Sequence, residues 1–324
     1  MSDFPAKDSL TVHFAHTAYQ LAKCFAARDT GIAHFQTWTP DETAQRITEG
    51  DVLVLSGFWD NAFLERAPKL KFIQGCAAGY NQFDQAALAA RGVRLCNASG
   101  VNANAVSDHA MALILSLHRQ LHLSRDNQRE KLWRPMISEI SERQEELAGK
   151  TLLIVGMGTI GQQLAKRAQA FDMRVVGVRR NVAAIDGMVD AAHPPADLPQ
   201  LWAEADVVAL TCALTPETTN IVDAEAFAAL PDTAYVINVS RGPCIDEPAL
   251  IDALRSGAIA GAGIDTTWEE PLAPTSPLWD MANVVLTPHT AGETRVYEEG
   301  VIDVLLENLD RLQRGETELA NQIV

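Results

Sequence analysis

Three polar residues in the second half of the sequence come just after stretches that read as β-strands. Arg241 follows one stretch, Glu270 lies in the loop after the next, and His289 follows a third. In an open α/β sheet, ligands bind beyond the carboxyl ends of the strands. We therefore expect an arginine, a carboxylate and a histidine to converge on one site.

These residue types suit the reduction of a 2-keto acid, whose carboxylate and carbonyl oxygen both need partners. Arg241 can hold the carboxylate through two parallel hydrogen bonds and can also reach the carbonyl oxygen. His289 is the candidate proton donor, because the ordinary pKa of histidine lies closest to ambient pH. Glu270 would orient the imidazole ring and favour its charged form. The alternative is that the three residues are unrelated surface charges.

The stretch TLLIVGMGTIG, residues 151–161, is the candidate for binding a dinucleotide. Its apolar run Leu152–Val155 is typical of a strand buried on both faces of a parallel sheet. The GxGxxG spacing belongs to Gly156, Gly158 and Gly161. The first glycine permits a tight turn, the second lets backbone approach a pyrophosphate, and the third lets a helix pack on the strand. A helix-compatible segment follows, so the phosphate would lie at a helix N-terminus, unless the motif is only a structural turn.

The choice between NAD and NADP depends on the residue about 20 positions beyond this turn. Arg179 and Arg180 follow the next strand-like stretch, and no acid occurs before Asp186. A carboxylate would hydrogen-bond the ribose 2′-hydroxyl, whereas arginine accommodates a 2′-phosphate. We therefore predict that NADP is preferred over NAD. The alternative is that both arginines are solvated, or stack on adenine without discrimination.

The whole chain alternates β-rich stretches with helix-compatible segments, which is typical of parallel sheets. In the first part of the chain the strand-like stretches are 10–14, 51–55, 70–74 and 93–96. In the second part they are 152–155, 174–178, 206–210, 234–239, 260–264 and 283–286. The predicted fold class is α/β, with two Rossmann-like or flavodoxin-like parallel-sheet domains and a cleft between them.

The length of 324 residues exceeds the usual size of one domain. We predict a substrate-binding (catalytic) domain made of residues 1–100 plus 290–324, and a dinucleotide-binding Rossmann domain made of residues 101–289. A helix over 295–312 would return the chain to the first domain.

A second long helix is expected where the chain enters the dinucleotide-binding domain. Its plausible N-cap is Asn102. Apolar residues recur at helical spacing at Val106, Ala110, Leu113, Ile114, Leu117 and Leu121. The segment 125–150 that follows is charged and irregular, and we interpret it as a connection or a subunit contact.

The composition limits the possible binding partners and the cellular location of the protein. The chain has 26 basic and 42 acidic residues, which gives a net charge of −16. This charge disfavours binding to nucleic acid and to anionic membranes. No apolar run approaches the roughly 20 residues that span a bilayer, and the start MSDFPAKDSL lacks signal-peptide features, so a cytoplasmic location is expected. The five cysteines form no CxxC pair, and His118 and His122 have no HExxH glutamate beside them. We predict neither a disulfide framework nor a metal site.

Several ordered motifs resemble those of the D-isomer-specific 2-hydroxyacid dehydrogenases, and the resemblance spans almost the whole chain. The motifs are GCAAGYNQFD (75–84), GMGTIG, LTPET (214–218), NVSRG ending at Gly242, the loop of Asp265 and Glu270, and TPH (287–289). The resemblance implies reversible hydride transfer from NAD(P)H to a 2-keto acid, giving a D-2-hydroxy acid. It also implies a homodimer formed through residues 103–133. The keto acid stays open among glyoxylate, hydroxypyruvate, pyruvate-like and aromatic compounds.

Matched position by position, the family implies a catalytic role for Arg241, Glu270 and His289. Backbone N–H groups of Ala77, Ala78 and Gly79 would hold the substrate carboxylate, with Asn102 nearby. Residues expected beside the cofactor are Val106, Thr159, Ile160, Cys212, Val239 and Asp265.

Two departures from the family pattern are mild. The family's usual AEH is here Ser107, Asp108 and His109, and Ala213 replaces the proline that often precedes LTPET. The formate dehydrogenase branch has glutamine where Glu270 stands, which disfavours that activity. Because transcriptional corepressors resemble this family, the competing hypothesis is a dinucleotide-sensing, corepressor-like scaffold of the same fold.

Overall fold

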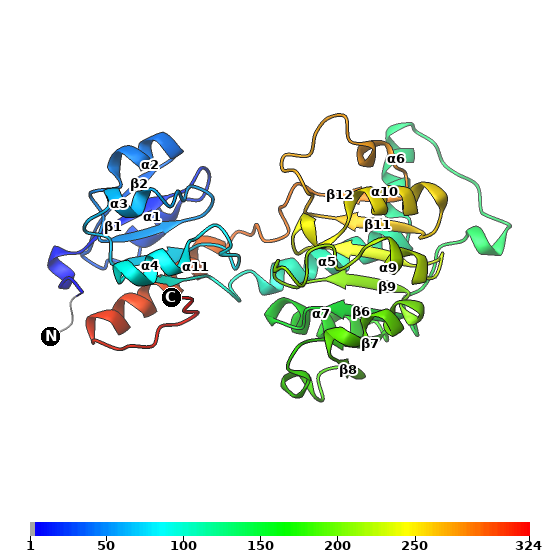
Figure 1. Cartoon of the computed structure of the whole chain (residues 1–324). Coiled ribbons are helices and arrows are strands. Elements are labelled where there is room, and N and C mark those ends of the chain that lie inside the picture. The colour runs from blue at the N-terminus through cyan, green and yellow to red at the C-terminus, as the bar shows by residue number, and fades with distance from the viewer. Residues whose placement is uncertain (1–3) are drawn as a thin grey trace. The chain divides into compact units, whose positions relative to one another are not determined.

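The computed structural model describes residues 4–324, and the chain divides into two compact units (Figure 1). Unit 1 comprises Met1–Val101 and Thr294–Val324, and unit 2 comprises Asn102–Glu293. The first residues of the predicted first domain, and of the start MSDFPAKDSL, lie outside the described part. Each unit is built on a parallel sheet with helices on both faces, so the predicted α/β class with two parallel-sheet domains is confirmed.

Unit 1 has a five-stranded parallel sheet in the order β2-β1-β3-β4-β5. The strands are β1 (Thr11–Ala15), β2 (Ala33–Thr37), β3 (Val52–Leu55), β4 (Phe72–Gly75) and β5 (Arg94–Cys96). Four of them lie where the apolar stretches predict strands. The sequence analysis missed β2, because this edge strand is half-exposed along most of its length and carries no continuous apolar run.

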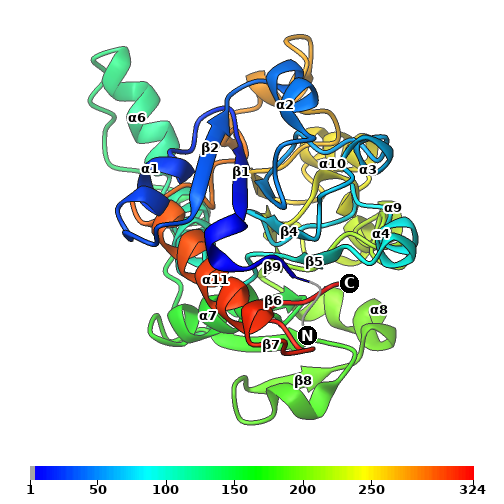
Figure 2. The ribbon, with the colours of Figure 1, turned by 90° about the vertical axis from the view of Figure 1, so that its left-hand side faces the viewer.

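Among the described residues, five helices cover the sheet of unit 1. They are α1 (Leu21–Ala26), α2 (Pro40–Arg46), α3 (Phe63–Arg66), α4 (Gln85–Arg91) and α11 (Tyr297–Gln313). On one face, α1 and α11 bury Phe25 and Leu305 against the strands. On the other face, α2, α3 and α4 pack around Leu53 and Leu88 (Figure 2).

The last residues of the chain pair with the edge strand β5. The Ile323 N–H donates to Leu95 O at 2.8 Å, and the Leu95 N–H donates to Val324 O at 3.2 Å. Leu309 of α11 lies in the same buried cluster as β1. Backbone pairing and apolar packing therefore both attach the C-terminal segment to unit 1.

Unit 2 has a seven-stranded parallel sheet in the order β12-β11-β10-β9-β6-β7-β8. The strands are β6 (Thr151–Val155), β7 (Arg174–Val178), β8 (Ala191–His193), β9 (Val207–Leu210), β10 (Tyr235–Asn238), β11 (Gly261–Ile264) and β12 (Val284–Leu286). All but β8 coincide with predicted strands. β8 is a half-exposed edge strand of three residues, too short to give a periodic signal.

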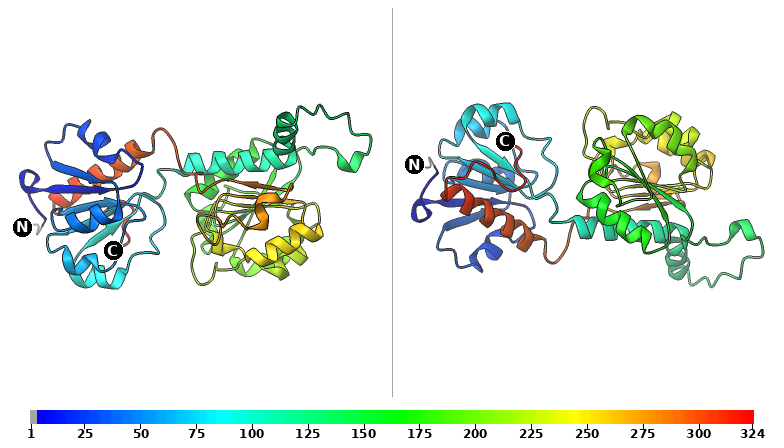
Figure 3. Two further views of the ribbon diagram at one scale, coloured as in Figure 1. Left: turned by 90° about the horizontal axis from the view of Figure 1, so that it is seen from above. Right: turned by 90° about the horizontal axis from the view of Figure 1, so that it is seen from below.

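Helices cover both faces of this sheet as well. They are α5 (Ala103–His118), α7 (Thr159–Gln169), α8 (Leu198–Leu201), α9 (Ala224–Ala229) and α10 (Glu247–Ser256). A further helix, α6 (Leu121–Arg129), follows α5 but buries none of its residues. On one face, α5 and α7 bury Ile114 and Leu164 against Ile154. On the opposite face, α8, α9 and α10 pack on Leu153 and Val155; Figure 3 shows α5 and α10 on opposite sides of the sheet. Short 3₁₀ turns occur at Lys7–Ser9, Ile140–Glu142, Val182–Ile185, Pro195–Asp197, Trp202–Glu204, Gly242–Cys244 and Pro277–Asp280.

The predicted long helix begins where expected, directly after Asn102, but it ends earlier than the apolar spacing predicts. It stops at His118, and Gln120, with φ of 50°, turns the chain before α6 starts at Leu121. Because α6 continues to Arg129, the segment 125–150 is not irregular throughout. Asn102 does stand just before α5, but its side chain makes no capping hydrogen bond.

Among residues 4–324, no helix is long and apolar enough to cross a membrane. All five cysteines are free thiols. Within the same described range, no three His, Cys, Asp or Glu side chains come together as metal ligands would.

Candidate active site

The sheet order of unit 2 puts the three candidate catalytic residues on neighbouring strand ends. Arg241 follows β10, Glu270 follows β11 and His289 follows β12, and these three strands are adjacent and parallel. Their carboxyl ends therefore meet at one edge of the sheet, where ligands bind in open α/β folds.

His289 and Glu270 are in direct contact. Nδ1 of His289 lies 2.7 Å from Oε2 of Glu270, and each side chain is roughly two-fifths exposed. The Thr267 N–H donates to the other carboxylate oxygen at 3.2 Å. Burial alone would raise the pKa of Glu270, but the hydrogen bond and charge of His289, the Thr267 N–H and the charge of Arg241 together lower it. The carboxylate is therefore held in its charged form beside the ring.

The backbone of His289 is in the left-handed region, with φ of 56°. Its N–H donates to Asp265 O at 2.8 Å. The Asp265 side chain is only 2% exposed and accepts from Thr287 Oγ1 at 2.6 Å, Thr290 N at 3.0 Å and Ala291 N at 3.1 Å. Main chain and side chain of Asp265 thus both hold the loop that carries His289.

His109 joins this network from α5. Its Nε2 atom lies 2.9 Å from Thr287 Oγ1 and 3.7 Å from Asp265 Oδ1. The sequence analysis singled out neither His109 nor Thr287 as a site residue. The available signals were the threonine of TPH and the histidine kept in the family's AEH position, but a link across 178 residues is visible only in the fold.

Arg241 lies in a loop that packs against the loop of Glu270. A Cβ atom at Gly242 would lie 2.0 Å from the Thr267 carbonyl carbon, so only glycine permits this approach. Arg241 Nη1 donates to Ser240 O at 2.7 Å, and Asn238 Nδ2 holds Arg241 O at 3.0 Å. The contact between the loops explains why the charge of Arg241 reaches Glu270.

The glycine turn after β6 fits a dinucleotide. Gly156 has φ of 103°, and a Cβ atom there would lie 2.5 Å from the Cys212 backbone N in the loop after β9. A Cβ atom at Gly161 would lie 2.5 Å from Gly156 O, so helix and turn are close-packed. By contrast, Gly158 is exposed with open space before it, at the N-cap of α7. A pyrophosphate can therefore approach the backbone N–H groups at this helix N-terminus without meeting a side chain.

Arg179 and Arg180 differ in their surroundings at the end of β7. Arg179 is half-buried, and its Nη1 donates to Met157 O of the glycine turn at 2.9 Å. Arg180 is exposed and donates no hydrogen bond to any described residue. Near it, Glu217 carries a lowered pKa, mainly through its hydrogen bond with Thr215 and in part through the charge of Arg180.

Comparisons with known proteins agree with this geometry. The model of the family "D-isomer specific 2-hydroxyacid dehydrogenase, NAD binding domain" matches residues 111–291. The chain belongs to this family. It is 34% identical to a glyoxylate reductase of Korarchaeum cryptofilum, covering 86% of the chain and 85% of the relative. It is 36% identical to the glyoxylate/hydroxypyruvate reductase B of Escherichia coli, covering 89% of each. A Thermus thermophilus structure matches with a TM-score of 0.84 and 33% identity, covering 97% of this chain and 100% of that one.

As a D-2-hydroxyacid dehydrogenase, the protein is an oxidoreductase that interconverts 2-keto and 2-hydroxy acids with a nicotinamide dinucleotide. The alternative of a corepressor-like scaffold is not favoured, since the relatives matched over most of the chain bear the names of reductases.

The remaining residues expected at the cofactor lie along the same edge of unit 2 or on α5. Thr159 and Ile160 open α7, Cys212 follows β9, Val239 follows β10, and Val106 is buried on α5. Asn102 precedes α5, and its Oδ1 atom is buried without accepting a hydrogen bond from any residue in the described range. A buried acceptor without a donor is expected where a ligand supplies one.

Three candidate residues lie in unit 1. Ala77, Ala78 and Gly79 form the half-exposed loop that follows β4. Nearby, Trp59 donates from Nε1 to Asn61 Oδ1 at 2.7 Å and packs on Phe83, with ring centroids 5.3 Å apart. Trp59 is therefore part of the apolar packing of unit 1. His118 and His122 lie on different helices and each contacts a backbone carbonyl.

Proposed function

We propose that the protein reduces a small 2-keto acid to the D-2-hydroxy acid, with His289 as proton donor, Glu270 as its partner and Arg241 as the group that holds the substrate. The observation that carries the proposal is the 2.7 Å contact between His289 and Glu270 at the ends of two adjacent strands. A test is the turnover of a panel of keto acids with reduced cofactor. Failure to reduce any of them would overturn the proposal.

A reduced nicotinamide, when bound, would supply the hydride. The substrate oxygen gains negative charge as its carbon is reduced. A positively charged group and a proton donor must therefore lie within hydrogen-bonding distance of this oxygen. Arg241 supplies the charge through a planar guanidinium that can bind carboxylate and oxygen together. His289 supplies the proton from Nε2, because Nδ1 is held by Glu270. The ionised carboxylate of Glu270 accepts from Nδ1 and fixes the direction of the ring.

The substrate carboxylate is assigned to the backbone N–H groups of Ala77, Ala78 and Gly79, and Asn102 is assigned to the reacting end of the substrate. Unit 1 would then be the substrate-binding (catalytic) domain and unit 2 the dinucleotide-binding domain. This division of roles is supported by the half-exposed loop after β4 and by the glycine turn after β6.

For the substrate, we favour glyoxylate and hydroxypyruvate, since the relatives with 34–36% identity are named for them. These acids are small and share only the carboxylate and the carbonyl with larger candidates. Comparison of kcat/KM for glyoxylate, hydroxypyruvate, pyruvate and phenylpyruvate separates the possibilities. A clear preference for phenylpyruvate would reject this choice.

For the cofactor, we propose that NADP is preferred over NAD. The support is the pair Arg179 and Arg180 at the end of β7, with Arg180 exposed and making no hydrogen bond to a described residue. Thr159, Ile160, Gly158 and Cys212 would line the rest of the cofactor.

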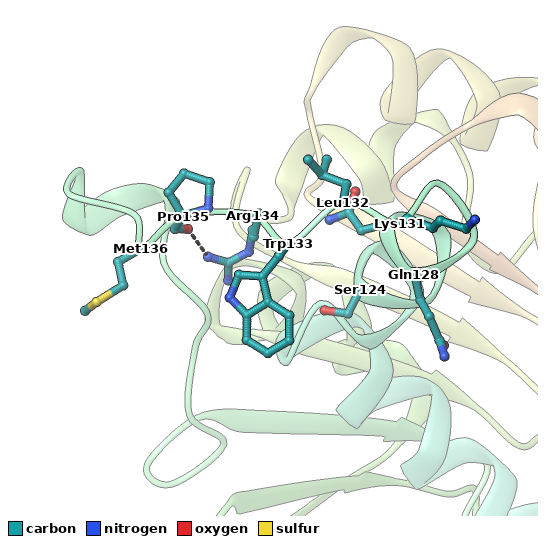
Figure 4. A pocket seen from close by; sticks show the side chains of 9 residues that line it. Ser124, Gln128, Lys131, Leu132, Trp133, Arg134, Pro135 and Met136 are labelled. Carbon is teal, nitrogen blue, oxygen red and sulfur yellow. Dashed lines mark hydrogen bonds between the residues drawn. The ribbon is translucent and has the colours of Figure 1, made fainter.

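We further propose a homodimer in which α5, α6 and the following segment bind a second copy of the chain. The support is apolar surface: Trp133 is 97% and Met136 is 96% exposed. Figure 4 shows both beside a groove of about 720 Å³ that includes Leu132 and Pro135. Exposed apolar patches of this kind mark protein–protein contacts. Light scattering tests the proposal: a monomeric wild type would refute it, and the double variant Trp133→Ser, Met136→Ser should dissociate.

A further inference from the structure

The loop after β4 presents three successive backbone N–H groups that have no acceptor among residues 4–324. They belong to Ala77, Ala78 and Gly79. The loop is half-exposed, so these N–H groups are not shut inside the unit. A row of unpaired N–H groups in one loop is suited to binding an anion.

The carbonyl groups of the same peptide units are all occupied. Cys76 O accepts from the Tyr297 hydroxyl, Ala77 O from the Ala98 N–H at 3.2 Å, and Ala78 O from Asn97 Nδ2 at 2.7 Å. The donors come from α11 and from the segment just after β5, all within unit 1.

This pattern has a simple geometric consequence. In a trans peptide the C=O and the N–H point in opposite directions, and the loop contains no cis bond. Fixing the carbonyls of residues 76, 77 and 78 therefore fixes the N–H groups of Ala77, Ala78 and Gly79 on the other side of the chain. Donors that are already oriented bind charge without the cost of reorganising the loop.

We infer that Tyr297 and Asn97 are positioning residues for an anion-binding nest formed by the N–H groups of Ala77, Ala78 and Gly79, which takes the substrate carboxylate. The inference rests on the proposed function for the identity of the anion. The third anchor, the Ala98 N–H, is backbone and is not removed by a side-chain substitution.

Both side chains are fixed in the orientation that this role needs. Tyr297 is 5% exposed and opens α11, and its ring lies against Tyr19 with centroids 5.1 Å apart. Burial, followed by the neighbouring Cys76, Tyr19 and Glu298, raises its pKa, so the hydroxyl stays a donor. Asn97 accepts from the Ser99 N–H through Oδ1 at 3.1 Å, which turns its NH₂ toward Ala78 O.

The test uses the full-length protein, isotope-labelled for NMR, with oxalate as the probe. Oxalate should shift the backbone amide signals of Ala77, Ala78 and Gly79 in a saturable manner. Tyr297→Phe keeps the ring and removes the hydroxyl, and should weaken oxalate about 5- to 20-fold, the effect of misaligning one hydrogen bond to a charged group. With the best keto acid, KM should rise by a similar factor while kcat changes less than about twofold.

Tyr235→Phe is the matched control, because it removes a half-buried tyrosine hydroxyl from unit 2, and its oxalate affinity should equal that of the wild type. Asn97→Ala provides the second variant if Tyr297→Phe fails to fold, and should weaken oxalate in the same way.

The outcomes separate the inference from the proposed function. If the wild type binds oxalate through the three amides but a folded Tyr297→Phe binds it equally well, the positioning role is wrong and the reductase proposal stands. If oxalate binding weakens in the variant but no keto acid is reduced, the nest stands and the proposed function falls. If oxalate leaves the three amides of the wild type unshifted, there is no nest, and the carboxylate assignment falls with it.

Discussion

Nδ1 of His289 lies 2.7 Å from Oε2 of Glu270, which leaves Nε2 as the ring atom able to give a proton to substrate. The two residues come from the ends of β12 and β11, which are hydrogen-bonded neighbours in the sheet. The pair therefore depends on the fold and on two loops, and each part can be altered separately.

His289→Ala should lower kcat for keto-acid reduction by about 10² to 10⁴, the usual contribution of general acid catalysis. Affinity for the reduced cofactor, measured by fluorescence titration, should stay nearly unchanged, because the side chain contacts Glu270 and not the glycine turn. A variant that keeps most of its kcat would show that another group donates the proton.

Glu270→Gln should lower kcat for keto-acid reduction. The pKa of Glu270 lies below its ordinary value of 4.5, so the carboxylate stays charged from the alkaline range down to below that pH and accepts a hydrogen bond from Nδ1 of His289. Glutamine keeps the shape of the side chain but replaces this charge-assisted hydrogen bond with a neutral one, so kcat should fall by about 10-fold. A wild-type kcat would contradict the role of Glu270, and Glu269→Gln, one residue earlier in the same loop, is the control.

Arg241→Lys should behave as a severe substitution. An ammonium group cannot reproduce a planar two-point contact with carboxylate and carbonyl oxygen, so kcat/KM should fall by at least about 10²-fold. Near wild-type kcat/KM would refute the two-point contact. The Thr267 loop packs on Gly242, not on the Arg241 side chain, so the unfolding midpoint should change little.

Thr287→Val should loosen the loop that carries His289. The hydroxyl donates to Asp265 at 2.6 Å and lies 2.9 Å from His109 Nε2, and valine leaves both partners without it. We expect a loss of about 1 to 3 kcal/mol in the free energy of unfolding, together with a lower kcat. Thr219→Val, which removes an exposed hydroxyl bonded only to Thr215 O, should change neither quantity. Equal behaviour of the two variants would mean that the network does not hold the loop.

The sequence is informative where strands are buried on both faces. Runs such as Leu152–Val155 show this environment directly, and a polar residue that follows such a run stands out, as Arg241 and His289 do. The edge strands β2 and β8 are half-exposed, so their patterns resemble loops. Periodicity alone therefore finds the centre of each sheet and misses its edges.

Two other features depend on tertiary contacts that no local pattern records. The break between α5 and α6 occurs at Gln120, which has a left-handed backbone conformation. No glycine or proline, the residues that normally signal a helix break, occurs at this position. Likewise, His109 meets Thr287 only because α5 packs against the end of the sheet that carries β12. For such residues the fold must be known before their role can be inferred.

The cofactor preference is the sharpest test of the dinucleotide site. Arg180 is exposed and makes no hydrogen bond to a described residue, so it can bind a 2′-phosphate, whereas Arg179 also holds Met157 O of the glycine turn at 2.9 Å. Bidentate arginine–phosphate contacts contribute about 1.5 to 3 kcal/mol, so we expect kcat/KM to be roughly 10- to 100-fold higher with NADPH than with NADH. Arg180→Ala should lower kcat/KM for NADPH and leave that for NADH almost unchanged. Arg179→Ala should lower both, because it also releases the turn, and the double variant should lose the preference.

Arg174→Ala, at the opposite end of β7 and paired with Glu204 at 3.4 Å, is the control and should use both cofactors as the wild type does. Equal use of the two cofactors by the wild type, or an unaltered preference in the double variant, would show that these arginines do not read the 2′-phosphate.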